Sequence, residues 1–154
     1  MKGFENAYIA DIAAMVGIRE SRNITTEYVL SAEDLLTRRK FDDAFCQSNY
    51  PVDIHGKTLD FASRGEPVDD GRPYYEIPYG SLVVKGFDNL LVAGRCASFT
   101  HEAMASTRVM STCMALGEAA GRAARIALRD GVKPSQADVA KLRSELKRTG
   151  AYLR

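Results

Sequence analysis

The hydrophobic pattern of the chain is densest between residues 89 and 131. Residues 90–93 form an apolar run of strand length that Gly94 closes, which is typical of a parallel strand covered on both faces by helices. A polar bend over residues 95–106 separates this run from a segment that is apolar almost all round and ends near Gly131. The pattern predicts a strand, a loop and then a long, largely buried helix.

Two glycines interrupt the predicted long helix. Gly117 and Gly121 lie four residues apart, so both face one side of the helix. Each glycine lowers helix stability by about 1 kcal/mol relative to alanine, which calls for a compensating contact. We expect close packing of the helix against a sheet at these two positions.

The N-terminal half alternates between helical and extended patterns. Apolar residues near helical spacing predict a first helix, which Gly17 ends, and β-branched residues then predict a strand. Ser31 and Asp34 resemble a capping box that opens a second, short helix. The predicted elements are a helix at 4–15, a strand at 23–29, a helix at 32–38, a helical turn at 41–47 and an extended segment at 50–55.

The remaining elements surround the central strand and helix. Turn-forming glycine, proline and aspartate fill residues 55–73, which predicts a loop or irregular hairpin. Short strands are predicted at 74–77 and 81–84, and an amphipathic closing helix with a solvated basic face is predicted at 135–148. The fold class expected is α/β: a central strand plus a long buried helix, with a small antiparallel β layer and peripheral helices.

Composition narrows the class of protein. With 154 residues, 45% of them hydrophobic, the chain is long enough for one core, so residues 1–154 are expected to form a single compact unit. The net charge of +1, without a basic block, gives no electrostatic footprint for nucleic acid. No apolar run reaches the length of a membrane helix and no signal peptide is recognisable, so we expect a cytoplasmic protein.

The three cysteines do not indicate a disulfide framework or a thiolate metal site. Cys46, Cys96 and Cys113 are odd in number and lack CxxC spacing, so reduced thiols are expected and no metal ligands are predicted. Cys113, near a helix start, and Cys96, in a polar bend, have positions where a thiol pKa is lowered. Packing is the preferred interpretation for both.

Several short motifs carry a resemblance to a known family. They include Asn89-Leu-Leu-Val-Ala-Gly-Arg-Cys96, Thr100-His-Glu-Ala103 and Arg108-Val-Met-Ser-Thr-Cys-Met-Ala115, and upstream Gly17-Ile-Arg-Glu-Ser-Arg22 and Ile77-Pro-Tyr-Gly-Ser-Leu82. In order and spacing these motifs resemble the C-terminal, flavin-contacting segment of bacterial FAD-dependent oxidoreductases of the broad glutathione-reductase-type superfamily. The resemblance covers nearly the whole chain and implies FAD as cofactor and a small organic molecule as substrate.

One expected motif of such a flavoprotein is missing. Holding the FAD pyrophosphate on a helix N-terminus requires a glycine-rich βαβ turn, and the sequence contains no GxGxxG. In the family that turn lies far upstream of the motifs matched here. The chain therefore resembles a C-terminal fragment, and we expect the missing N-terminal FAD-binding half to be one of its partners.

The resemblance implies a set of cofactor-binding residues. Gly94 would allow close backbone contact with the flavin, and the helix that begins near Arg108 would direct backbone N–H groups at the flavin's pyrimidine edge, where negative charge develops on reduction. The family usually has proline where this chain has Ser111. The predicted cofactor-binding residues are Gly94, Arg95, Val109, Ser111, Thr112 and Cys113.

Catalytic and substrate-binding residues are less sharply indicated. His101 in the bend is a candidate acid or base or a substrate ligand, and Arg108 joins it in the candidate catalytic set. His55 alternates with Asp53 on an extended segment, so the carboxylate would raise its pKa and favour a proton shuttle, although an ordinary half-buried strand gives the same pattern. Arg19 or Arg22 would pair with a carboxylate of an acidic substrate or a neighbouring loop, and a solvated salt bridge explains them equally well.

An alternative from another class is a non-catalytic binding module that uses the loop from Arg95 to Thr112 to bind a partner or an anion without redox chemistry. Either way, the chain alone lacks a pyrophosphate site, so we expect it to be colourless and inactive. The surface that would meet the missing half is apolar, which favours a homo-oligomer.

Overall fold

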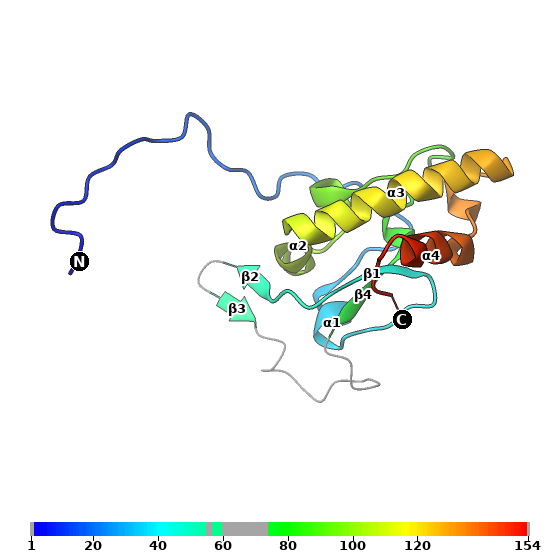
Figure 1. Ribbon diagram of the computed structural model, residues 1–154, viewed down its shortest axis with the longest axis horizontal. Helices are drawn as coiled ribbons and strands as arrows, with labels where there is room; N and C mark the ends of the chain where they lie inside the picture. Colours follow the sequence, from blue (N-terminus) through cyan, green and yellow to red (C-terminus); the bar gives the residue numbers. More distant parts are fainter. Residues whose placement is uncertain (1, 55–56, 60–73, 154) are drawn as a thin grey trace.

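Residues 2–22 form an extended arm. The computed structural model describes residues 2–54, 57–59 and 74–153 of the chain, and in Figure 1 the arm leads away from the rest of the molecule. The helix predicted at 4–15 is wrong, because no regular element occurs there and Tyr8, Ile12 and Met15 are 85%, 75% and 84% exposed. A helix this short is marginal in water without a surface on which to bury its apolar face.

Helix α1 (Ala32–Leu36) begins where its capping residues predict. The Ser31 side chain accepts a hydrogen bond from the backbone N–H of Asp34, and the Asp34 carboxylate accepts one from the backbone N–H of Ser31 at 2.9 Å. The buried Asp34 also accepts bonds from Tyr28 Oη at 2.9 Å and Arg39 Nη1 at 3.0 Å. The helix stops earlier than predicted, before Arg38 adopts a positive φ of 53°.

Two small antiparallel pairs make up the regular β structure. Strand β1 (Ala44–Ser48) pairs with β4 (Tyr75–Pro78), and β2 (Val52–Ile54) pairs with β3 (Lys57–Leu59). The small antiparallel layer is therefore confirmed, whereas the helical turn predicted at 41–47 is wrong. β1 buries its first three residues against the core, which is more burial than an isolated helical turn at the surface would give them.

The predicted central strand at 90–93 is reduced to one bridge. Leu91 pairs with Val83 in an antiparallel bridge, and the N–H of Val92 donates to the carbonyl of Leu82 at 2.9 Å. Val92 is buried, but Leu90 is 40% exposed. The strand predicted at 23–29 is likewise one bridge, between Thr26 and Val84. A strand buried on both faces needs neighbouring strands, and the described residues supply only this antiparallel partner.

A short helix that the hydrophobic pattern did not predict separates the bend from the long helix. The chain turns through η3 (Gly94–Cys96), forms α2 (His101–Thr107), breaks at Arg108 and Val109, and continues as α3 (Met110–Asp130). Thr100 caps α2 by accepting a hydrogen bond from the N–H of Ala103. The long helix is confirmed, and it begins a few residues later than expected.

Helix α3 is buried on one face only. Leu116, Ala119, Ala123 and Ile126 are fully buried, while Met110, Met114 and Leu128 on the opposite face are 77%, 74% and 83% exposed. A Cβ atom added at Gly117 or Gly121 would meet no atom within 4 Å. The close packing expected at these two glycines is therefore absent among the described residues, and the prediction of burial all round is wrong.

The C-terminal segment closes the core from the other side. Lys133 and Pro134 end the preceding turn as predicted; η4 (Pro134–Gln136) follows, and then α4 (Val139–Arg148), which Asp138 caps. α4 packs alongside α3, as Figure 1 shows, with Leu142 and Leu146 buried in the same core as Leu116 and Ile126. The predicted closing helix is confirmed over most of its length.

Candidate functional site

Four residues predicted for three different roles line one cavity. Arg19, Arg95, Arg108 and Val109 surround a space of about 350 Å³ at the junction of the arm, η3 and the break between α2 and α3. Tyr50, Asp53, Ala105 and Met110 complete its lining. The fold thus brings together a candidate substrate ligand, a candidate catalytic residue and two candidate cofactor contacts.

Hydrogen bonds to backbone carbonyls hold two of the guanidinium groups in place. Arg108 follows the last turn of α2, and its Nη2 donates to the carbonyl of Asp53 on β2 at 2.8 Å. Arg95 Nε lies 3.4 Å from the carbonyl of Arg108, and its Nη1 lies 3.5 Å from the carbonyl of Ile18 in the arm. The two side chains therefore link four segments that are distant in the sequence.

The cavity is rich in positive charge. Three arginines line it, and Asp53 is the one acidic residue among the described lining residues. Neither Arg95 nor Arg108 forms an ion pair with a carboxylate of the described part of the chain. A guanidinium is well shaped to hold a carboxylate or phosphate with two parallel hydrogen bonds, so the arrangement suits an anion.

The start of α3 adds to this charge. Val109 is the N-cap residue and provides no side-chain cap, so the first-turn N–H groups of α3 have no intrahelical partner and carry partial positive charge. Val109 and Met110 both line the cavity. The end of the helix therefore has the same sign of charge as the nearby guanidinium groups.

The other predicted cofactor residues do not line this cavity. Ser111 is exposed and lines a separate groove, whereas Thr112 is buried in the core at 3% exposure. Gly94 has a positive φ of 76°, and a Cβ atom there would meet nothing within 4 Å, so the turn itself favours glycine. Conformation, rather than close contact with another described residue, accounts for glycine at this position.

Cys113 is half buried, with its Sγ 3.9 Å from the carbonyl of Thr107. Burial raises the pKa of the Cys113 thiol; the nearby Arg95 charge has a smaller, opposite effect on this pKa, and Cys96 adds to the rise. The neutral thiol is therefore favoured. This agrees with packing as the role of Cys113.

His101 and Arg22 are not among the described residues that line this cavity. His101 opens α2 and is exposed, with its Nδ1 2.8 Å from the Glu20 carboxylate, so the pair ties the arm to α2. Arg22 lies in an adjoining space of about 250 Å³ that Arg19 and Arg95 also line. His55, the proposed partner of Asp53, lies outside the described residues.

A larger groove of about 850 Å³ runs between β1, the first turns of α3 and the C-terminal residues. Ser111, Met114 and Tyr152 line it, together with Gln47, whose Oε1 atom is buried and has no hydrogen-bond partner among the described residues. Sequence reasoning missed Gln47 because it assigned this segment to a helical turn. β1 offers no alternating pattern as a signal, because its first three residues are all buried and the next two are half-buried.

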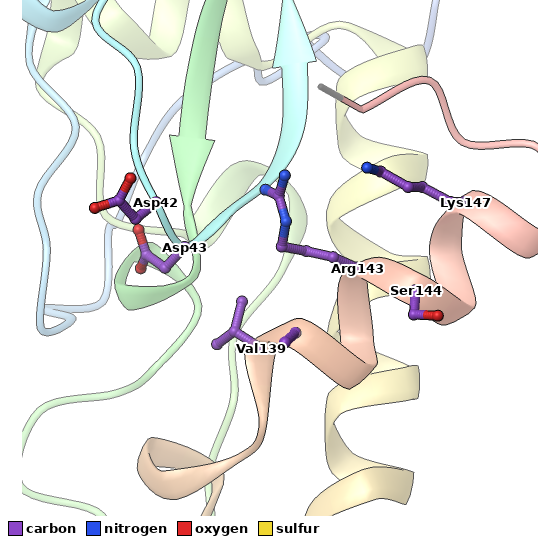
Figure 2. A pocket seen from close by; sticks show the side chains of 7 residues that line it. Asp42, Asp43, Val139, Arg143, Ser144 and Lys147 are labelled. Carbon is purple, nitrogen blue, oxygen red and sulfur yellow. The ribbon is translucent and has the colours of Figure 1, made fainter.

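A further pocket of about 580 Å³ lies between α4 and the segment that precedes β1. Figure 2 shows Asp42 and Asp43 on one side of it and Arg143 and Lys147 on the other. The Arg143 guanidinium donates to the carbonyl of Ala44 on β1. The expectation that all basic residues of α4 are merely solvated is therefore wrong for Arg143, which joins this helix to β1.

Comparison with known proteins identifies the family. A model of the FAD dependent oxidoreductase family matches residues 1–146, which is nearly the whole chain. No curated protein and no solved structure gives a match. Within the described residues, no helix is long and apolar enough to cross a membrane. The match over most of its length shows that the chain belongs to the FAD-dependent oxidoreductase family.

Proposed function

We propose that the chain forms the flavin-edge part of an FAD-dependent oxidoreductase that acts on a small organic substrate. Family membership supports oxidation or reduction with FAD as the activity of the intact enzyme. One observation carries the finer proposal: the uncapped start of α3 lies at the cavity that Arg95 and Arg108 line. A helix start of this kind suits an electron-rich group, and the guanidinium groups suit a charged substrate beside it.

The residues present fit one end of FAD. The first-turn N–H groups of α3, from Met110 to Thr112, would hold the carbonyl edge of the isoalloxazine ring and stabilise negative charge there. When bound, FAD supplies the acceptor or donor of electrons. The pyrophosphate requires a glycine-rich turn, and the sequence has no GxGxxG. We propose that residues outside this sequence, the N-terminal half of the FAD site, hold the pyrophosphate.

The arginines have the better position for contact with substrate. Arg108 lines the cavity, whereas His101 opens α2 beside Glu20 and is not among the residues that line it. The cavity also has an apolar side, formed by Ala105, Val109 and Met110, which suits the carbon skeleton of an organic molecule. In this proposal Arg108 and Arg95 orient the substrate and the start of α3 faces the flavin.

Flavin titrations of the purified chain test the proposal. Riboflavin contains the ring without a phosphate, so the chain should bind riboflavin and FAD weakly and with similar affinity, measured by quenching of flavin fluorescence. The purified chain should be colourless. Loss of the pyrophosphate contacts removes several charge-assisted hydrogen bonds of about 1.5–3 kcal/mol each, which explains the weak binding. A yellow protein with stoichiometric FAD would contradict the proposal that this chain lacks the pyrophosphate site.

A charge at the start of α3 provides a matched control. Met110→Glu places a negative charge beside the predicted flavin edge and should weaken riboflavin binding about threefold, which corresponds to a helix-end charge effect of about 0.3–1 kcal/mol. Leu128→Glu adds the same charge at an equally exposed position near the other end of α3 and should leave binding unchanged. If neither flavin binds, or both variants behave alike, a binding module without redox chemistry becomes the better description.

We also propose that the isolated chain self-associates. The outer face of α3 exposes Met110, Met114 and Leu128, and contact with a second copy would remove this apolar surface from water. A sizing column run at several protein concentrations tests this, since self-association makes the elution volume depend on concentration. A monomer at every concentration would contradict it.

A further inference from the structure

The cavity between the arm, η3 and α2 brings the side chains of Arg95 and Arg108 together, and neither forms an ion pair with a carboxylate of the described residues. The two arginines come from η3 and from the break between α2 and α3, and like charges repel unless something offsets them. Arg95 and Arg108 bond only to backbone carbonyls within the described residues. Convergence of these groups is unfavourable in the protein alone, which indicates that an anion belongs between them.

Both guanidinium groups keep donors available for such an anion. Each guanidinium has five N–H donors, and Arg108 uses Nη2 for the carbonyl of Asp53, while Arg95 makes two long contacts of 3.4 and 3.5 Å. The bond from Arg108 to Asp53 fixes the orientation of the side chain before a ligand arrives. A side chain that is already oriented loses less conformational entropy on binding.

The start of α3 favours the same class of ligand independently of the arginines. Val109 and Met110 line the cavity, and the first-turn N–H groups that follow have no side-chain cap. Partial positive charge at a helix start attracts carboxylates and phosphates. The helix in question is 21 residues long, so this effect is fully developed.

Size and apolar lining narrow the ligand further. The volume of about 350 Å³ lies at the lower end of the range of small-molecule sites, about 300–1,000 Å³. Ala105, Val109 and Met110 offer carbon surface next to the guanidinium groups. Inorganic phosphate has no carbon skeleton to use this surface, whereas a short organic acid does.

We propose that this cavity binds a small organic acid with two carboxylate groups, held by Arg95 and Arg108 beside the positively charged start of α3. The inference rests on the proposed function, because it assigns the substrate class of the same site. Asp53, which also lines the cavity, opposes a ligand with still more negative charge. The ligand is therefore a compact dianion rather than a polyphosphate.

Calorimetric titration of the full chain with succinate tests the proposal, with succinamide as the neutral analogue of the same shape and inorganic phosphate as the carbon-free anion. Succinate should bind more tightly than phosphate, and succinamide should not bind. Arg95→Gln and Arg108→Gln should each weaken succinate binding at least about tenfold, because each removes charge-assisted hydrogen bonds of about 1.5–3 kcal/mol. Arg148→Gln, at the exposed end of α4, is the matched control and should leave the affinity unchanged.

Arg108→Gln also removes the bond to Asp53, so a thermal melt accompanies each variant. The native Arg95 side chain makes only long contacts, so Arg95→Gln removes no short hydrogen bond. This variant keeps the proposal testable if the Arg108 variant unfolds. Equal binding of succinamide, or unchanged succinate affinity in the Arg95 variant, overturns the proposal. Tighter binding of phosphate than of succinate also overturns it in favour of a phosphate site. Riboflavin binding without succinate binding would refute this inference alone, and leave the proposed function standing.

Discussion

The hydroxyl oxygens of Tyr75 and Ser106, 31 positions apart in the sequence, lie 2.7 Å apart in the core. Ser106 gives its proton to the carbonyl of Tyr50, so Tyr75 is the donor to Ser106. This short chain of hydrogen bonds joins β4 to α2 and to the segment that enters β2. Both hydroxyl-bearing residues are fully buried, which makes the chain sensitive to the loss of its central member.

Removing the Ser106 hydroxyl should therefore destabilise the fold. Ser106→Ala leaves the carbonyl of Tyr50 and the hydroxyl of Tyr75 each without this bond, and we expect a loss of about 1–3 kcal/mol in the free energy of unfolding. Urea denaturation monitored by circular dichroism measures it. Ser144→Ala on the exposed side of α4 is the control and should change stability by less than about 0.5 kcal/mol. Similar small effects in both variants would show that the hydrogen-bond chain contributes little.

Stability should fall in alkaline solution because of Cys46. Burial raises the pKa of the Cys46 thiol from 9.0 to about 12, and a backbone hydrogen bond with Gln47 has a smaller, opposite effect on this pKa. The folded-state pKa exceeds the unfolded one, so the unfolded chain loses this proton first as pH rises. The contribution is complete below about pH 9 and is lost as pH rises toward about 12. Tyr75, whose pKa burial raises to about 12, adds to the loss above about pH 10.

Urea denaturation at pH steps between about 8 and 10 isolates the thiol, because the unfolded tyrosines remain protonated over most of this window. Cys46→Ala should reduce the slope of stability against pH there. Cys113, also with a raised pKa but less buried, accounts for a residual slope. An unchanged slope in the Cys46 variant would exclude this thiol as the cause.

Replacing Gln47 with an apolar residue of similar length should stabilise the protein. The Oε1 atom of Gln47 is buried and finds no partner in the part of the chain that the structure describes, which costs about 1–3 kcal/mol of desolvation. We expect Gln47→Met to raise the free energy of unfolding by about 1 kcal/mol and the melting temperature by about 2–4 °C. Gln136→Met, at an exposed position in η4, should have no such effect. A lower melting temperature for Gln47→Met would mean that this oxygen has a partner in solution.

Alanine substitution at two glycines of α3 should have opposite effects. Gly117 has helical backbone and open space around it, so Gly117→Ala should stabilise the isolated chain by about 1 kcal/mol. Gly131 ends the helix with a positive φ of 66°, where a side chain is strained, so Gly131→Ala should destabilise it by about 1 kcal/mol. Thermal melts measure both. If both substitutions raised the melting temperature, or both lowered it, the backbone conformations of these two glycines would be contradicted.

Local signals in the sequence predicted the fold best. Ser31 and Asp34 place the start of α1 correctly because both capping bonds lie within one turn. The apolar spacing of residues 4–15 is helical, yet these residues are extended, because periodicity shows which face a helix would bury and not whether a surface is there to bury it. The apolar run at 90–93 likewise shows which residues a strand would bury, and not whether neighbouring strands are there to pair with it. The break at Arg108 and Val109 contains neither glycine nor proline, so no residue in the sequence marked the end of α2 as a separate helix.

The candidate site was predictable only in part. The family resemblance indicated Arg19, Arg95, Arg108 and Val109 for separate roles, and long-range folding places them around one cavity. Tyr50 had no such signal, since a tyrosine before proline is equally common in ordinary loops. The contact between the Arg108 guanidinium and the carbonyl of Asp53 spans 55 positions, and no local pattern encodes a contact of that kind.

Helix α2 carries Ser106, the centre of the buried hydrogen-bond chain, only two residues before Arg108, the guanidinium that β2 orients. A substitution that displaces Ser106 also displaces Arg108, because a helix this short moves as a rigid body. Laboratory evolution toward a new ligand would therefore meet correlated outcomes: variants selected for altered binding near Arg108 should also differ in expression yield and heat tolerance. Compensating substitutions should arise at β4 and at the entry to β2, remote from the cavity itself.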